Sequence, residues 1–409
     1  MERIAFVTLL IITSGHLTSA IDPLKGGNAS RQDSLVESSN LLGLQILQLF
    51  NEKNVVFSPL SVSTVLSMVY LGARGATAHQ MAHKLHYERY SLTDRDLLAG
   101  YQDLLLELSP PSSFLRSRPY VLESASALLV SKDFKLNKTY RNNVQRAFSA
   151  PVEPIDFEKD AKQTVELVND WAKEKTKGKI EKILEYLPAQ TKLFLLNALY
   201  FKGLWKIPFD TDFTSMQTFN NLDGSQSVVL TMFIAEEFNY VYDPGMRAEV
   251  IELPYLGNGG VSLFIFLPEN IRNFGNLLQS LTADRIRQVI GSISEQRLEV
   301  SMPKLKLENR LQLKDALNAL GMTVMWNDAA DLSGMGSGNL KVDQVVHQAT
   351  LELDEKGSRA AAVSGIAIAA KSLRSAKEFR VNRPFVFFIG HRGTGAVLFL
   401  GQVVSVKGI

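Results

Sequence analysis

The chain of 409 residues contains no cysteine. This absence excludes disulfide bonds, thiol catalysis and cysteine-ligated zinc from its chemistry. The chain also has almost no charge excess, because 44 lysines and arginines stand against 42 aspartates and glutamates. A nucleic-acid partner, which would need a concentrated basic surface, is therefore not expected. No apolar run reaches the roughly eighteen residues that a membrane-spanning helix needs, so no membrane partner is expected either.

The composition that remains is typical of a globular protein with a large core. Hydrophobic residues make up 45% of the chain and charged residues 21%, within the usual range for folded domains. No internal repeat and no long linker rich in proline, glycine or serine interrupts the sequence. Residues 21–409 are therefore expected to form one domain, and a monomer, stabilised by its core alone.

The first twenty residues have the pattern of a secretory signal peptide. Arg3 precedes an apolar run at 4–12, and the small residues at 18–20 suit a cleavage site, although Glu2 weakens the basic start. This pattern predicts a secreted, extracellular protein. Two Asn-x-Ser/Thr triplets, at Asn28 and Asn137, then predict glycan attachment sites.

Hydrophobic periodicity divides the chain into a helix-rich first half and a strand-rich second half, which predicts an α+β fold. The expected helices and strands have the following ranges. Helices are expected at 34–50, 61–72, 77–86, 92–108, 160–174 and 311–320, and strands at 120–131, 192–201, 228–240, 247–253, 260–267 and 297–307, with a buried hairpin at 379–407.

Three patterns in the sequence could indicate a catalytic, phosphate-binding or metal site. His79, His83 and His86 share one face of a helix, but no acidic residue completes the usual metal motif. The glycine-rich segment 334–338 lacks the Lys-Ser/Thr pair of a phosphate-binding loop. His347 stands in a strand-like segment, where a hydrogen-bonded core histidine is more common than a catalytic base. No catalytic residue, metal ion or cofactor is therefore predicted, and the chain is not expected to be an enzyme.

Six short motifs, spread over residues 35–409, resemble those of the serpin family and follow the family's order and spacing. They are FSPLS at 57–61, LGARG at 71–75, TKGKI at 176–180, LNALYFKGLW at 196–205, DEKG at 354–357 and FRVNRPFVF at 379–387. The resemblance implies a serpin fold, with three β-sheets, about nine helices and an exposed reactive-centre loop at about 355–377.

The segment that follows Gly357 has the pattern of a strand with one buried face. Alternate residues from Ser358 to Ile368 are small or apolar, and the single charge, Arg359, belongs to the other set. Resemblance to inhibitory serpins implies that this segment enters the central sheet after cleavage. Arg359 replaces the acidic residue usual in the family. The hinge that the resemblance implies consists of Glu355, Gly357, Ser358, Ala360, Ala361 and Ala362.

The family's loop length places the cleaved bond fourteen residues after Gly357, between Lys371 and Ser372. The rival bond, between Arg374 and Ser375, would leave a longer insertable segment than inhibitors usually have. A lysine before the bond suits a trypsin-like protease with an acidic primary pocket. The resemblance therefore implies a suicide substrate that forms a covalent complex with such a protease.

Further residues match family positions that control the central sheet. The resemblance places Trp205 where the loop enters the sheet, and it pairs Lys304 with Glu355 at the loop base. A polar cluster under the sheet, where the strands must part, is expected to contain Ser58, Ser61, Asn197 and His347.

Two alternatives stay open at this point. A non-inhibitory serpin, acting as a carrier or a chaperone, has the same fold, although the small-residue hinge favours an inhibitor. Some family members also bind glycosaminoglycans through the helix that corresponds to 92–108. That helix has one base, Arg95, against Asp94, Asp96, Asp103 and Glu107, so little or no heparin effect is expected through it.

Overall fold

A computed structural model describes residues 30–50, 52–108, 120–257, 260–355 and 376–408. The predicted signal segment, Asn28 and the reactive segment 356–375 lie outside the described residues. In the described part of the chain, helices and strands mix as the sequence predicts, and the strands form three sheets of nine, five and two strands. The α+β expectation is confirmed.

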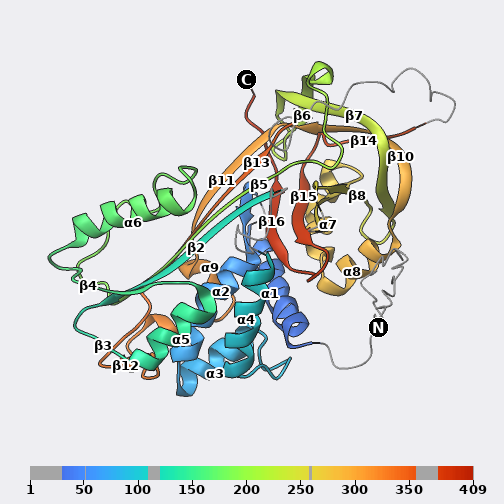
Figure 1. Ribbon diagram of the computed structural model, residues 1–409. Helices are drawn as coiled ribbons and strands as arrows, with labels where there is room; N and C mark the ends of the chain where they lie inside the picture. Colours follow the sequence, from blue (N-terminus) through green and yellow to red (C-terminus); the bar gives the residue numbers. More distant parts are fainter. Residues whose placement is uncertain (1–29, 51, 109–119, 258–259, 356–375, 409) are drawn as a thin grey trace, which may run out of the picture.

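The five-stranded sheet forms the centre of the molecule (Figure 1). Its strand order is β11 (Leu305–Gln312), β13 (Gln344–Leu353), β5 (Leu193–Gly203), β2 (Tyr120–Ser131) and β4 (Val152–Ile155). β13 and β5 are parallel and pair directly, from Gln344 opposite Phe194 to Leu351 opposite Phe201. The neighbouring pairs β11–β13 and β5–β2 are antiparallel. The sheet is thus closed between β5 and β13.

The nine-stranded sheet contains the C-terminal hairpin. Its path runs through β1 (Val55–Phe57), β16 (Val397–Val403), β15 (Phe385–His391), β9 (Val261–Pro268), β8 (Ala248–Pro254), β7 (Gln226–Asp243), β10 (Ser294–Pro303) and β14 (Lys377–Arg380), while β6 (Ser215–Asn220) pairs with β7 off this path. The two-stranded sheet consists of β12 (Gly336–Ser337) and β3 (Lys135–Leu136). The predicted buried hairpin at 379–407 is confirmed as β15 and β16.

Nine helices are described, as the resemblance implies. They are α1 (Arg31–Leu47), α2 (Pro59–Gly72), α3 (Gly75–Lys84), α4 (Asp94–Leu108), α5 (Lys138–Phe148), α6 (Ala161–Lys175), α7 (Phe274–Ser280), α8 (Ala283–Ser292) and α9 (Lys314–Ala319). Sequence signals mark the N-termini of several of these helices. The Ser58 hydroxyl accepts a hydrogen bond from the Ser61 N–H, and Pro59 occupies the first helical position of α2.

One strand expectation is wrong. The sequence predicts a single strand at 297–307, but the chain passes between two sheets there, because β10 ends at Pro303 and β11 begins at Leu305. β11 also occupies the start of the helix expected at 311–320, which shortens to α9. Apolar residues continue through this crossing, so the periodicity gives no sign of it.

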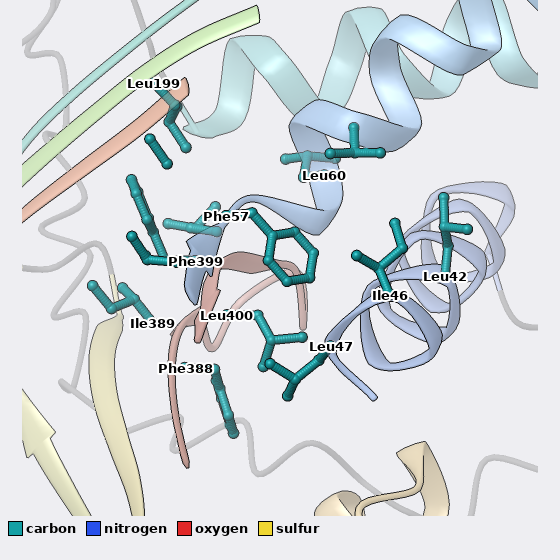
Figure 2. Packing of buried hydrophobic residues seen from close by; sticks show 14 of the residues in the cluster. Leu42, Ile46, Leu47, Phe57, Leu60, Leu199, Phe388, Ile389, Phe399 and Leu400 are labelled. Carbon is teal, nitrogen blue, oxygen red and sulfur yellow. The ribbon is translucent and has the colours of Figure 1, made fainter. Parts of the chain in front are cut away.

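The core lies on both faces of the central sheet. On one face, α1 and α2 pack with β15 and β16 through Leu42, Ile46, Leu60, Phe388 and Leu400 (Figure 2). On the other face, α6 covers the sheet, and its Val168 and Ala172 belong to a separate cluster with Phe194, Leu196 and Val346. Within the described ranges, no helix is both long and apolar enough to cross a bilayer.

Candidate functional site

The expected polar cluster lies beneath the junction of β5 and β13. His347, on β13, is fully buried, and its Nε2 accepts a hydrogen bond of 3.0 Å from the Ser58 N–H. Nδ1 therefore carries the proton and donates to Asn197 Oδ1 at 2.8 Å. The Asn197 carboxamide, on β5, in turn donates from Nδ2 to Ser126 Oγ of β2 at 2.9 Å. Burial lowers the pKa of His347 to about 3, so the ring is neutral at physiological pH.

This chain of hydrogen bonds crosses the central sheet. It joins α2, β13, β5 and β2 through Ser58, His347, Asn197 and Ser126. Ser61 contributes through its N–H, which donates to Ser58 Oγ at 3.1 Å. The sequence did not point to Ser126. The register that sets it opposite Asn197 follows only once the strands are paired, although a small polar residue in an apolar strand was a usable signal.

A second group of contacts holds the end of β13. Trp205 Nε1 donates to the Asp354 carbonyl oxygen at 2.8 Å. The indole stacks on the Tyr255 ring, with the centroids 4.4 Å apart and the planes at 10°. The phenol of Tyr255 is fully buried beneath it, and burial raises its pKa well above the usual value. Trp205 is thus bonded to the end of β13, its role at the loop entry stays a prediction, and Tyr255 is a partner that the sequence did not indicate.

The expected ion pair at the loop base is present. Lys304 Nζ lies 2.9 Å from a Glu355 carboxylate oxygen, and Thr214 Oγ1 donates to the other oxygen at 2.9 Å. The Glu355 side chain is 8% exposed. Burial alone would raise the pKa of Glu355, but the hydrogen bonds, that from Lys304 first among them, outweigh it and lower the pKa. Glu355 is therefore held as a carboxylate where the reactive segment begins.

Lysines also connect β13 to its neighbours along the same edge. Lys202 on β5 lies 3.4 Å from Glu352, near the end of β13, and 3.3 Å from Asp354, just after that strand. Lys179, in the segment after α6, lies 3.4 Å from Glu352 as well. Opening the sheet between β5 and β13 would separate these charges.

The far end of the reactive segment is held by β14, which pairs in parallel with β10. The Lys377 ammonium lies 4.3 Å from the centroid of the Tyr240 ring and 3.4 Å from Glu249. β13 and β14 both reach the end of the molecule drawn at the top of Figure 1. The two anchors of the reactive segment therefore belong to different sheets at the same pole.

Several predicted residues fall outside the described part of the chain. These are Gly357, Ser358, Ala360, Ala361 and Ala362 of the hinge, and Lys371, Ser372, Arg374 and Ser375 of the two candidate bonds. Their roles stay predictions. Asn137 is described, and its side-chain oxygen accepts hydrogen bonds from the N–H groups of Thr139 and Tyr140 at the start of α5. Its role as a glycan acceptor also stays a prediction.

The histidine and glycine patterns form no metal or phosphate site in the described part of the chain. His79 and His83 both lie beside Glu88, at 3.2 and 3.3 Å, but His86 faces Gln45 instead. Among the described residues, no group of three suitable side chains is arranged to hold a metal ion. Gly336 and Ser337 of the glycine-rich segment 334–338 form β12, and a Cβ on Gly336 would come within 2.1 Å of the Lys135 carbonyl oxygen. Gly336 therefore allows the close approach of the two strands.

Comparison with known proteins gives one consistent family. The sequence model of the family described as "Serpin (serine protease inhibitor)" matches residues 38–406. Intracellular coagulation inhibitor 2 of Tachypleus tridentatus is 36% identical over 91% of this chain and 91% of its own. Iripin-2 of Ixodes ricinus is 35% identical over 92% and 94%. The leukocyte elastase inhibitor of Xenopus tropicalis is 36% identical over 86% and 93%.

Solved structures agree with this result. The mouse protein-Z dependent protease inhibitor has a TM-score of 0.82 and 28% identity, and the match covers 92% of this chain and 98% of that one. Uncleaved ovalbumin has a TM-score of 0.81 and 26% identity over 92% and 100%. Human thyroxine-binding globulin has a TM-score of 0.83 at 23% identity over the same shares, which shows a common fold.

The predicted extracellular location is contradicted by these comparisons. Two relatives, the coagulation inhibitors 2 and 1 of Tachypleus tridentatus, are intracellular by name. The prediction depended on the apolar run at 4–12. A run of that length also suits a segment that a folded domain buries, so hydrophobicity alone does not decide the location.

The family model matches most of the chain, and the three relatives above are 35–36% identical to it over most of both lengths. The chain belongs to the serpin family.

Proposed function

We propose that this serpin inhibits trypsin-like serine proteases as a suicide substrate and is cleaved between Lys371 and Ser372. A lysine before the cleaved bond fits the acidic primary pocket of such proteases. Relatives that are inhibitors by name support inhibition as the general activity. The rival bond between Arg374 and Ser375 lies three residues further along.

The parallel pairing of β5 and β13 is the observation that carries this proposal. β13 ends at Leu353, so a strand that turned back after Glu355 would run antiparallel to β13. Because β5 is parallel to β13, the same strand is antiparallel to β5 too. Insertion would replace one parallel pair with two antiparallel pairs, which are slightly more stable per residue.

The covalent step follows ordinary serine protease chemistry. The protease serine oxygen attacks the carbonyl carbon of Lys371, and its proton passes through the histidine to the nitrogen of Ser372. The bond between Lys371 and Ser372 breaks, and an ester joins the chain to the protease. Insertion of residues 358–371 then carries the protease away before water hydrolyses the ester.

Insertion would release enough free energy to be irreversible. About fourteen residues gain ladder hydrogen bonds at roughly 0.5–1.5 kcal/mol net each, and their small and apolar side chains become buried. The sum is on the order of 10–20 kcal/mol, comparable to the whole stability of an ordinary domain. The native form is therefore metastable.

The polar cluster would act as a latch in this step. His347 and Asn197 are directly opposite each other on β13 and β5, and their 2.8 Å hydrogen bond spans the closed junction. Neighbouring strands lie about 4.8 Å apart, so an inserted strand would separate these two by about 9.6 Å. The hydrogen bond must then break, and each partner must find a new one.

Incubation with trypsin tests the proposal. We expect a covalent complex that survives denaturing gel electrophoresis, and a released peptide that begins at Ser372 and ends at residue 409 in mass spectra. Lys371→Ala should abolish the complex, whereas Arg374→Ala, the matched control, should leave it intact. A chain that is cleaved without forming a complex would instead indicate a non-inhibitory serpin, such as a carrier.

A further inference from the structure

Asp343 connects the start of β13 to the start of β5. One oxygen of its carboxylate, Oδ2, accepts hydrogen bonds from the N–H of Lys192 at 2.6 Å and from the N–H of Leu193 at 3.2 Å. The Asp343 N–H donates in turn to the Leu193 carbonyl oxygen at 2.9 Å. Leu193 is the first residue of β5, and Asp343 directly precedes Gln344, the first residue of β13. All three bonds therefore cross the junction between these strands, and we call them the Asp343 bridge.

The Asp343 bridge lies at the end of the junction that is remote from the reactive segment. β13 runs from Gln344 to Leu353, and the loop-base residue Glu355 follows its other end. At about 3.3 Å per residue, the chain between Asp343 and Glu355 spans roughly 40 Å. The polar cluster bonds the two strands at an intermediate position, through His347. The bridge is therefore a separate connection between β5 and β13, at their far end.

An inserted strand would have to break the Asp343 bridge. The proposed mechanism adds residues 358–371, about fourteen in all, whereas β13 has ten residues. A two-residue turn, the commonest hairpin connection, would set Ser358 opposite Glu355 and Lys371 opposite Val342. The last residues to enter would then lie beside Asp343. Because an inserted strand would hold β5 and β13 about 9.6 Å apart, the hydrogen bonds of the bridge would be lost there.

From this geometry we infer that Asp343 controls the last stage of insertion. The bonds at the loop base and in the polar cluster would break as the first residues enter, but the Asp343 bridge would break only when the residues next to Lys371 arrive. Those residues carry the attached protease. A stronger bridge delays their arrival and gives water more time to hydrolyse the ester. Asp343 is thus a positioning residue that biases the reaction between a trapped and a released protease.

The carboxylate of Asp343 determines the strength of the bridge. Hydrogen bonds from N–H groups to a carboxylate are roughly twice as strong as those to a neutral acceptor. The amide oxygen of Asp343→Asn could accept the same two N–H groups, but as weaker, neutral bonds, whereas Asp343→Ala could accept neither. These two variants therefore grade the bridge without changing the residues that enter the sheet. The inference rests on the proposed function, because it requires that a strand can enter between β5 and β13.

Annealing of synthetic peptides to the intact protein isolates this stage. The probes are fluorescein-labelled peptides with the sequences of residues 358–371 and 358–366, and fluorescence polarisation follows their binding. The short peptide would end opposite His347, about 13 Å before Asp343. In Asp343→Ala, we expect the long peptide to anneal about tenfold faster and the short peptide to change less than twofold. Asp328→Ala is the matched control, because that exposed aspartate bonds the side chain of Lys341 at 2.6 Å and should change neither rate.

Asp343→Asn supplies the second measurement, and it decides the question even if Asp343→Ala does not fold. With the long peptide it should anneal about two- to threefold faster than the wild type, and with the short peptide at the wild-type rate. The inference is overturned by wild-type annealing of the long peptide in both variants, by equal acceleration of both peptides, or by an asparagine variant as fast as the alanine variant. Failure of the proposed function is distinct, because neither peptide would anneal to the wild type and trypsin would form no covalent complex with it.

Discussion

Replacing Asn197 with alanine tests whether the polar cluster holds the sheet closed. The substitution removes the acceptor of the buried His347 Nδ1–H and the donor to Ser126 Oγ. A buried donor without a partner costs about 1–3 kcal/mol, and the lost bond to Ser126 adds about 1 kcal/mol. We therefore expect the intact form to lose about 2–4 kcal/mol of unfolding free energy.

This loss converts into a melting shift. Unfolding entropy is about 2.1 cal/mol/K per residue near 60 °C, which for a chain of this length amounts to about 0.9 kcal/mol/K. The intact variant should then melt about 2–4 °C below the wild type. In the cleaved form, the proposed inserted strand would already separate His347 from Asn197, so the melting temperature of that form should fall by less than half as much.

Differential scanning calorimetry of the intact and the cleaved forms measures both shifts. Asn221→Ala is the matched control, because Asn221 is also buried, at 4% exposure, and bonds Ser225, Ser227 and Val406 far from the junction of β5 and β13. That control should lower both melting temperatures equally. Equal shifts in the two forms of Asn197→Ala would refute the reasoning, since the bond would then contribute the same in both states.

Three further outcomes are expected. The pKa of His347 is about 3 in the folded chain and about 6.5 when unfolded, so protons favour the unfolded state below pH 6.5. Intact stability should fall by about 2 kcal/mol between pH 7 and 5 in urea titrations, and His347→Asn should flatten that slope. Lys304→Ala leaves the Glu355 carboxylate without its cation and should lower the unfolding free energy of the intact form by about 1–2 kcal/mol. Lys306→Ala, two residues further along on the exposed edge, should change this free energy by about 0.5 kcal/mol at most. Heparin should raise the rate of trypsin inhibition less than about threefold, and a hundredfold gain that salt abolishes would contradict the acidic character of α4.

Periodicity predicted most strands and helices because each reflects local burial. It failed where the deciding feature is not local. The helix α5 was not predicted, since only Tyr140, Val144, Ala147 and Phe148 of its eleven residues are buried. Its N-cap residue, Asn137, was predicted only as a glycan acceptor, although the same side chain caps the helix.

The residues of the candidate site were predictable only where they match family motifs. Ser58, Asn197 and His347 were expected together and are bonded together. Ser126 and Tyr255 were not expected, because each acquires its role from a neighbour on another strand. Contacts of this kind depend on register and on ring packing, which the order of residues along one strand does not specify.

The crossing at Lys304 leaves the chain no slack between its two large sheets. Pro303 is the last residue of β10 and Leu305 is the first of β11. Consecutive Cα atoms are 3.8 Å apart, so only two such steps, through Lys304, connect the two sheets, and a shift of one sheet must displace the other. A movement of β10 in the nine-stranded sheet should therefore move β11 in the central sheet, which is the sheet proposed to receive the inserted strand.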